Sequence, residues 1–145
     1  MSIVYWDTMM FIYLLEGDPI FTPKVERFQR EIERRGDALV TSVFTLGEVL
    51  TGPRKADDAS AVSAIKSYFA SGAVAILPFD SATADRYSMV RSMCKVSQAD
   101  AIHLASAAVA GASAFVTNDA DLRRLVIPGI GFMVDLDGNT HSPPP

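Results

Sequence analysis

Short apolar runs alternate with longer segments of helical periodicity along the chain. The apolar runs cover residues 3–6, 39–43, 74–77, 114–117 and 132–134. Such near-continuous stretches are typical of strands that are buried on both faces. Between the first two runs, Val25, Phe28 and Ile32 repeat at helical spacing, and Gly36 follows as a stop signal. The alternation predicts an α/β domain with a central parallel sheet of about five strands.

The remaining segments contain further predicted helices, one predicted helix break and a predicted tail. A helix from about Leu46 is expected to break at Gly52 and Pro53, with the turn projecting Arg54 and Lys55 outward. Later helices are expected from apolar stripes in residues 62–69, 81–94 and 98–110. The last nine residues, DGNTHSPPP, predict a loose tail. We therefore expect one domain over residues 1–136 and a flexible C-terminal tail over residues 137–145.

Length and composition fit one compact domain and narrow the functional classes. The chain has 145 residues, of which 49% are hydrophobic, and a formal net charge of −4. It has no global basic field, so a nucleic-acid partner would require metal ions and local basic patches. A single cysteine, no signal-peptide pattern and no apolar stretch of membrane-spanning length predict a cytoplasmic protein without a membrane partner.

Four acidic residues mark the places where predicted strands and helices meet. They are Asp7, Glu48, Asp100 and Asp119. Because such junctions share one edge of an open parallel sheet, these residues are expected to meet in a single anionic crevice. Clustered carboxylates repel one another at neutral pH, and a divalent cation would relieve that repulsion.

Each acid also has an ordinary structural explanation. Asp7 and Asp119 could cap the helices that follow them, with Asp121 as an alternative to Asp119. Thr45 and Glu48 match a capping box. Asp100 falls in a first helical turn, where the helix dipole favours a carboxylate. Together these explanations require four independent coincidences.

The residue types favour Mg²⁺, with Mn²⁺ as a substitute, because both prefer hard oxygen ligands. Zinc is disfavoured, since Cys94 and the two histidines lack the spacing of a zinc site. His103 shares a helix with Asp100 and could reach a metal or substrate. We interpret it as a packed helix residue, and Cys94 as a small core residue.

At these acidic positions the chain resembles the PIN domain family, and within it the VapC ribonuclease toxins of type II toxin-antitoxin pairs. The matching strings are IVYWDT, TLGEVL, ADAIHLA and VTNDADL. The resemblance implies a three-layer α/β/α sandwich and a Mg²⁺- or Mn²⁺-dependent endoribonuclease. It implies that Asp7, Glu48, Asp100 and Asp119 are catalytic and bind the metal, with Asp121 as the competitor of Asp119. Polar support is expected from Thr8, Thr117 and Asn118.

The resemblance also implies an RNA substrate, a VapB-like antitoxin and a homodimer. The candidates for phosphate contact are basic residues near the crevice: Arg54, Lys55, Arg91, Lys95, Arg123 and Arg124. A groove for the antitoxin, or simply the core, is expected from the apolar residues Met9, Met10, Phe11, Tyr13, Leu14, Val25, Phe28 and Ile32.

Other functions fit the sequence less well. A phosphatase of the haloacid dehalogenase type would need a second aspartate where Met9 stands, and a receiver domain would need an aspartate where Pro78 and Phe79 follow the third strand. A PIN nuclease of RNA processing and a non-catalytic RNA- or protein-binding module remain the alternatives.

Overall fold

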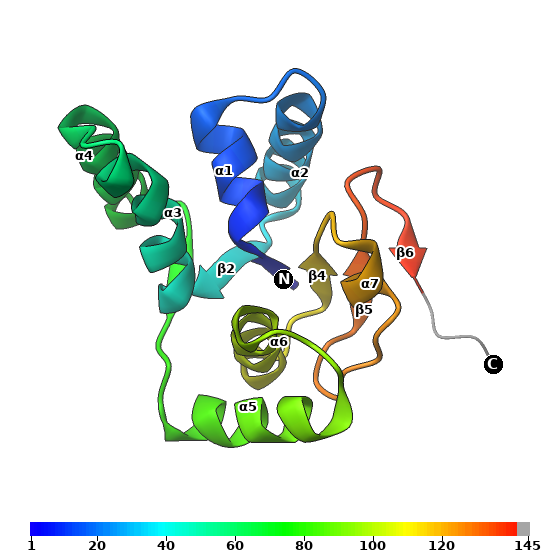
Figure 1. The fold of residues 1–145 in the computed structure, drawn as a ribbon. Coiled ribbons are helices and arrows are strands. Elements are labelled where there is room, and N and C mark those ends of the chain that lie inside the picture. Colours follow the sequence, from blue (N-terminus) through cyan, green and yellow to red (C-terminus); the bar gives the residue numbers. More distant parts are fainter. Residues whose placement is uncertain (142–145) are drawn as a thin grey trace.

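Within residues 1–141, six strands form one sheet through the middle of the molecule (Figure 1). The computed structural model describes residues 1–141. The strand order is β3-β2-β1-β4-β5-β6, in which the first five strands are parallel and β6 is antiparallel to β5. The strands are β1 (Ile3–Trp6), β2 (Ala38–Ser42), β3 (Ala75–Leu77), β4 (Ala114–Val116), β5 (Phe132–Val134) and β6 (Thr140–His141).

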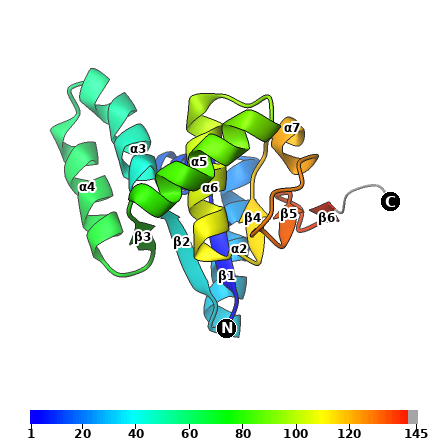
Figure 2. The same ribbon diagram turned by 90° about the horizontal axis from the view of Figure 1, so that it is seen from below.

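Helices cover both faces of this sheet. One face carries α1 and α2, the other carries α5 and α6, and α3 and α4 form a pair beside the edge strand β3 (Figures 1 and 2). The helices are α1 (Thr8–Glu16), α2 (Phe21–Arg35), α3 (Val43–Lys55), α4 (Ala59–Ala70), α5 (Ser81–Met93), α6 (Gln98–Ala110) and α7 (Ala120–Arg123). The expected three-layer α/β/α sandwich is confirmed.

Each face of the sheet has its own hydrophobic core because strand side chains alternate in direction. Val4 and Trp6 of β1 pack with the helices of the first face, whereas Tyr5 between them packs with α6 on the second. Tyr5 and Trp6 have no exposed surface. Burial on both faces explains why the strands are uninterrupted apolar runs in the sequence.

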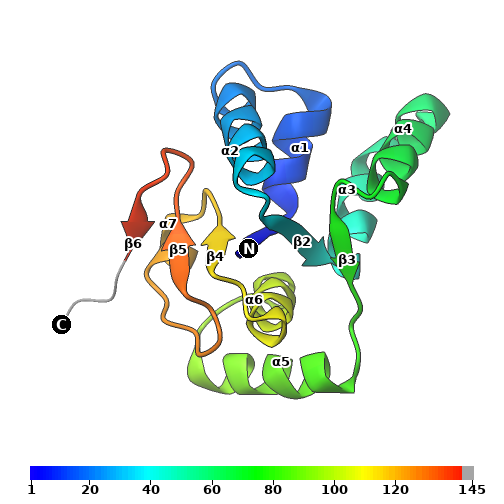
Figure 3. The same cartoon turned by 180° about the vertical axis from the view of Figure 1, so that it is seen from behind.

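The order of the strands creates a crevice at the centre of the sheet. The chain places β2 and β3 on one side of β1, then crosses over to place β4 and β5 on the other side (Figure 3). In open α/β sheets, ligands bind outside the carboxyl ends of the strands at such a reversal. Asp7 follows β1 and Thr117 follows β4, so both lie at this position.

The predicted strands are confirmed to within a residue at each end. β2 ends one residue earlier than expected, because the side chain of Ser42 accepts a hydrogen bond from the amide of Phe44 and caps α3 at Val43. Gly36 ends α2 in the left-handed conformation, as the sequence predicted, and Gly111 ends α6 in the same way.

The predicted break in the helix at Gly52 and Pro53 is wrong, and the described part of the predicted tail forms regular structure. The helix α3 continues through Gly52 and Pro53 to Lys55, because a proline in the last turn removes only one backbone hydrogen bond near the helix end. Residues 137–141, expected to belong to the flexible tail, form a turn and the strand β6. The Asp135 carboxylate stabilises that turn by accepting the amides of Asp137 and Asn139. The three final prolines lie outside the described residues.

None of the helices within residues 1–141 combines the length and the apolar composition needed to cross a membrane.

Candidate active site

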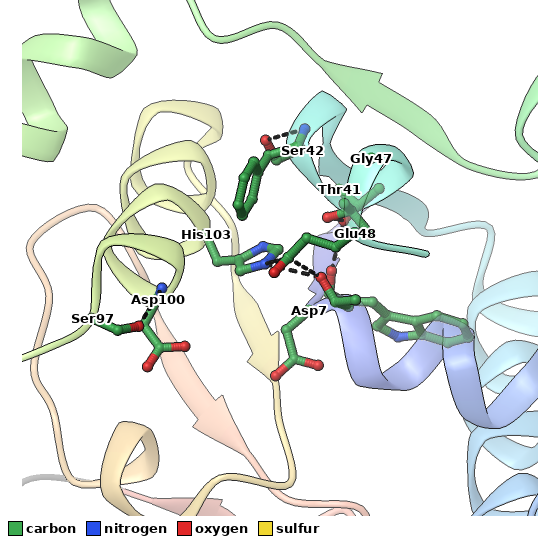
Figure 4. Close-up of polar contacts among 12 residues, drawn as sticks. Asp7, Thr41, Ser42, Gly47, Glu48, Ser97, Asp100 and His103 are labelled. Atoms are coloured by element: carbon green, nitrogen blue, oxygen red, sulfur yellow. Dashed lines mark hydrogen bonds and ion pairs between the residues drawn. The ribbon is translucent and has the colours of Figure 1, made fainter. Parts of the chain in front are cut away.

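All four predicted acids line one cavity at the carboxyl ends of the central strands. The cavity has a volume of about 470 Å³. Figure 4 shows Asp7, Glu48 and Asp100 entering the same space from three different elements. The lining residues are Asp7, Thr8, Met9, Ile12, Tyr13, Glu48, Ala99, Asp100, His103, Asn118, Asp119 and Leu122. The predicted convergence of distant acidic side chains is therefore present in the fold.

Asp7 occupies the N-cap position of α1 but does not cap the helix. Its side chain makes no capping hydrogen bond. Instead, Oδ2 accepts a hydrogen bond of 2.6 Å from the hydroxyl of Thr117. The other oxygen, Oδ1, is buried and has no hydrogen-bond partner among the described residues. Burial raises the pKa of Asp7 above its ordinary value, against the opposing effect of the Thr117 hydroxyl.

Thr117 links the first acid to the fourth. Its hydroxyl donates to Asp7 and accepts the backbone amide of Asp119 at 3.1 Å. The Asp119 carboxylate in turn accepts the amide of Asp121 at 2.8 Å and caps the short helix α7. Asp121 is exposed, does not line the cavity and lies 3.9 Å from Arg124. The geometry therefore places Asp119 rather than Asp121 at the cavity.

Glu48 lies in the middle of α3, and the predicted capping box with Thr45 is wrong. Ser42 caps the helix, and the buried hydroxyl of Thr45 lies 2.7 Å from that of Thr41. The carboxylate of Glu48 therefore projects into the cavity, where Oε1 accepts a hydrogen bond from the Thr8 hydroxyl. Burial alone would raise the pKa of this carboxyl, but the hydrogen bonds from His103 and Thr8 lower it below its ordinary value.

Asp100 and His103 reach the cavity from α6. Ser97 caps this helix by accepting the Asp100 amide at 3.1 Å, which leaves the Asp100 side chain at the cavity wall. His103 is 4% exposed, and its Nε2 lies 2.8 Å from Glu48 Oε1. The expectation that His103 is only a packed helix residue is therefore incomplete, because it is buried and also contacts an acid of the cavity.

The residues fit a hard divalent cation in two respects. The donors are carboxylate oxygens, which Mg²⁺ and Mn²⁺ prefer. The buried, unpartnered Oδ1 of Asp7 is an acceptor that normally requires a partner, and a cation would satisfy it. Among residues 1–141, no group of three His, Cys, Asp or Glu side chains is arranged to hold a metal ion by itself. Mg²⁺ does not require one, since it is usually bound through one or two carboxylates and retains several waters.

The six basic candidates do not line the cavity. Arg123 is turned inward, and its guanidinium lies 3.3 Å from the backbone oxygen of Thr117. This hydrogen bond stabilises the loop after β4. The exposed candidates are Arg54, Lys55, Arg91, Lys95 and Arg124, and their role in RNA binding stays a prediction.

Four of the eight apolar residues expected to form a groove are buried in the core. Met10, Phe11 and Val25 have no exposed surface, and Ile32 is 8% exposed. Met9 is different, because it is 42% exposed and lines the cavity together with Tyr13. The apolar surface next to the acids is therefore smaller than the sequence suggested.

A family model decides the classification. The model of the PIN domain matches residues 4–127, which includes all four acids. The chain belongs to the PIN domain family. No curated protein gives a significant sequence match.

Solved structures share the fold of this PIN domain at low sequence identity. The VapBC2 structure from Rickettsia felis, bound to a promoter DNA fragment, has a TM-score of 0.74 at 16% identity and covers 92% of this chain and 98% of its own. DNA-bound VapBC from Salmonella typhimurium has a TM-score of 0.66 at 23% identity and covers 94% of this chain and 99% of its own. Mycobacterium tuberculosis VapC20, described as a toxin that cleaves the sarcin-ricin loop, has a TM-score of 0.64 at 19% identity and covers 81% of this chain and 91% of its own.

Proposed function

We propose that this PIN domain is a Mg²⁺- or Mn²⁺-dependent endoribonuclease and the toxin of a VapBC-type pair. One observation carries the proposal: the carboxylates of Asp7, Glu48, Asp100 and Asp119 line a single cavity at the reversal of the sheet. A cavity that gathers four acids from distant parts of the chain has no evident structural purpose. Its chemistry suits a hard cation that binds RNA phosphate.

When bound, the cation would supply an activated water and polarise the scissile phosphate. Neighbouring side chains hold two of the carboxylates in position for the cation. Thr117 fixes one oxygen of Asp7 and leaves the other unpartnered, while Thr8 and His103 fix one oxygen of Glu48. Carboxylates held by such hydrogen bonds need little rearrangement when an ion binds. Asp100 and Asp119 line the rest of the cavity, where they can bind the ion or orient its waters.

The toxin assignment and the expected partners rest on the structural relatives. Two of the structures compared above are VapBC complexes on DNA, and another is a VapC toxin. In this chain, Met9, Ile12 and Tyr13 give the cavity part of its apolar lining, which a VapB-like antitoxin could cover. We propose such an antitoxin, an RNA substrate and a homodimer as the partners.

The nuclease proposal is tested by cleavage of a fluorescently labelled RNA in the presence of Mg²⁺ or Mn²⁺. Asp7→Asn and Asp100→Asn should each lower the cleavage rate by about 100-fold or more, because each removes a group that stabilises charge in the reaction. Asp121→Asn is the matched control, since this exposed aspartate lies outside the cavity and should leave the rate unchanged. Cleavage that survives in both cavity variants would refute the proposal.

The toxin proposal needs a separate test in cells. Expression of the wild type should arrest growth, Asp100→Asn should not, and a short DNA-binding protein encoded beside the gene should relieve the arrest. RNA cleavage without any growth effect would instead favour a PIN nuclease of RNA processing. Absence of cleavage under all metal conditions would leave a non-catalytic binding module.

A further inference from the structure

His103 is held on both of its ring nitrogens inside the protein. The Nδ1 atom lies 2.7 Å from the hydroxyl oxygen of Tyr5, and Nε2 lies 2.8 Å from Glu48 Oε1. The imidazole also packs edge-on against the rings of Tyr5 and Phe44, with ring centroids 5.9 and 5.8 Å away. This packing fixes the plane of the ring, so the two nitrogens cannot exchange places easily.

The Tyr5 hydroxyl has a backbone donor on its far side and keeps its own proton. The hydroxyl oxygen accepts the backbone amide of Ser42 at 3.2 Å. Burial raises the pKa of Tyr5 far above its ordinary value, so the hydroxyl keeps its proton. Since the amide can only donate, the Tyr5 hydroxyl is free to donate to His103 Nδ1.

The tautomer of His103 follows from its partner at Nε2, because the ionised Glu48 carboxylate can only accept a hydrogen bond. A neutral imidazole that accepts at Nδ1 carries its proton on Nε2. The Nε2–H group then donates to Glu48 Oε1, the oxygen that also accepts the Thr8 hydroxyl. The second oxygen, Oε2, receives no hydrogen bond from any residue in the described part of the chain.

We infer that His103 is a positioning residue for Glu48, held as the Nε2–H tautomer by a chain of hydrogen bonds from the Ser42 amide through Tyr5. The chain runs from the backbone of β2 through the hydroxyl of β1 to the imidazole of α6, and it ends on the glutamate of α3. It ties the carboxylate to the rigid sheet and leaves Oε2 available in the cavity. The role of Oε2 toward a cation rests on the proposed nuclease function.

The tautomer itself can be measured without metal, RNA or activity. Long-range ¹H–¹⁵N correlation spectra of the metal-free protein report protonation at each ring nitrogen, and His103 is told apart from His141 by a His141→Gln variant. We expect an unprotonated Nδ1 and a protonated Nε2. Protonation at Nδ1, protonation at both nitrogens or an average of tautomers would overturn the inference, whatever the fate of the nuclease proposal.

The positioning role is tested by two substitutions that split the ring's contacts. In His103→Gln the side-chain amide can reach the place of Nε2 and donate to Glu48. In His103→Asn the shorter side chain reaches only the place of Nδ1. By Mn²⁺ titration calorimetry, His103→Asn should weaken binding by about 10- to 100-fold, as loss of a group that orients a metal ligand does, and His103→Gln should retain most of the affinity.

Equal weakening by both variants would show that only packing matters, and unchanged binding in both would remove His103 from the site. Far-UV circular dichroism controls for folding, since both variants lose a similar amount of buried ring. If the wild type binds no Mn²⁺, the proposed function fails, and the spectra still decide the tautomer.

Discussion

Thr117→Val removes one hydroxyl that serves two elements of the site. The hydroxyl donates to Asp7 Oδ2 at 2.6 Å and accepts the Asp119 amide at 3.1 Å. Thr117 has no exposed surface, so the substituted side chain stays enclosed by the same neighbours. Valine has nearly the shape of threonine, and the change therefore isolates the polar contacts from the packing.

The expected cost in the free energy of unfolding follows from those two bonds. A hydrogen bond to a charged group contributes about 2 kcal/mol and a neutral one about 1 kcal/mol, which gives about 3 kcal/mol in all. Thr117→Ser keeps the hydroxyl and loses one methyl group, for which about 1 kcal/mol is expected. Thr117→Ser is therefore the matched control, because it changes the packing and keeps both hydrogen bonds of the hydroxyl.

Urea denaturation of the metal-free protein at pH 8 measures both values. The cost of Thr117→Val should shrink as the pH falls, because protonation of Asp7 weakens the bond that the hydroxyl makes. It should also shrink in the Asp7→Asn background, where the acceptor carries no charge. A loss below about 0.5 kcal/mol, the usual range of a change without structural role, would refute the reasoning, as would equal losses in the valine and serine variants.

Three further perturbations test the energetics of the site and the sheet. Burial raises the pKa of Asp7 in the folded protein, so the stability of the metal-free wild type falls as the pH rises through that raised pKa. Metal-free Asp7→Asn should therefore be more stable than wild type at pH 8, and the difference should disappear in acid. A variant less stable than wild type at pH 8 would contradict this prediction. Hydrogen bonds lower the pKa of Glu48, so the ionised carboxylate stabilises the folded protein at neutral pH, and this stabilisation is lost as the pH falls through the lowered pKa. Glu48→Gln should therefore be less stable than wild type at pH 7 but not in acid. A loss of stability independent of pH would contradict this prediction. In thermal denaturation, Gly131→Ala should lower the free energy of unfolding by about 1–3 kcal/mol, because the added Cβ would overlap the backbone oxygen of Ser113. The control Gly47→Ala, at an exposed helix position, should raise the free energy of unfolding by about 0.5–1 kcal/mol. Similar effects of the two substitutions would refute the proposed overlap.

The sequence predicted the strands and the meeting of the acids because both depend on patterns that survive folding. Parallel strands buried on both faces must be apolar throughout, so residues 3–6 and 114–117 were recognisable as strands. Acids that follow such strands must lie at one edge of the sheet, which placed Asp7 and Asp119 near each other.

The errors arose where tertiary contacts override local signals. Thr45 and Glu48 have the spacing of a capping box, but Ser42 starts the helix three residues earlier and turns Glu48 toward the cavity. A Gly-Pro pair usually breaks a helix, but Pro53 is buried near the end of α3, where little hydrogen bonding is lost.

The part of His103 in the site could not be derived from local sequence. Its partners Tyr5 and Glu48 lie 98 and 55 residues away along the chain. One signal was present, since His103 falls one helical turn after Asp100 and so shares its face of α6. That spacing indicates proximity to the cavity but not the contact with Glu48.

Crystals soaked in Mn²⁺ would test the central claim most directly, because anomalous scattering locates the ion without an assay. The account predicts a peak in the cavity between Asp7 and Asp100, bonded to the otherwise unpartnered Oδ1 of Asp7, and its loss in Asp7→Asn crystals. A cavity that stays empty at saturating Mn²⁺, or a peak bound only at other sites, would contradict the account.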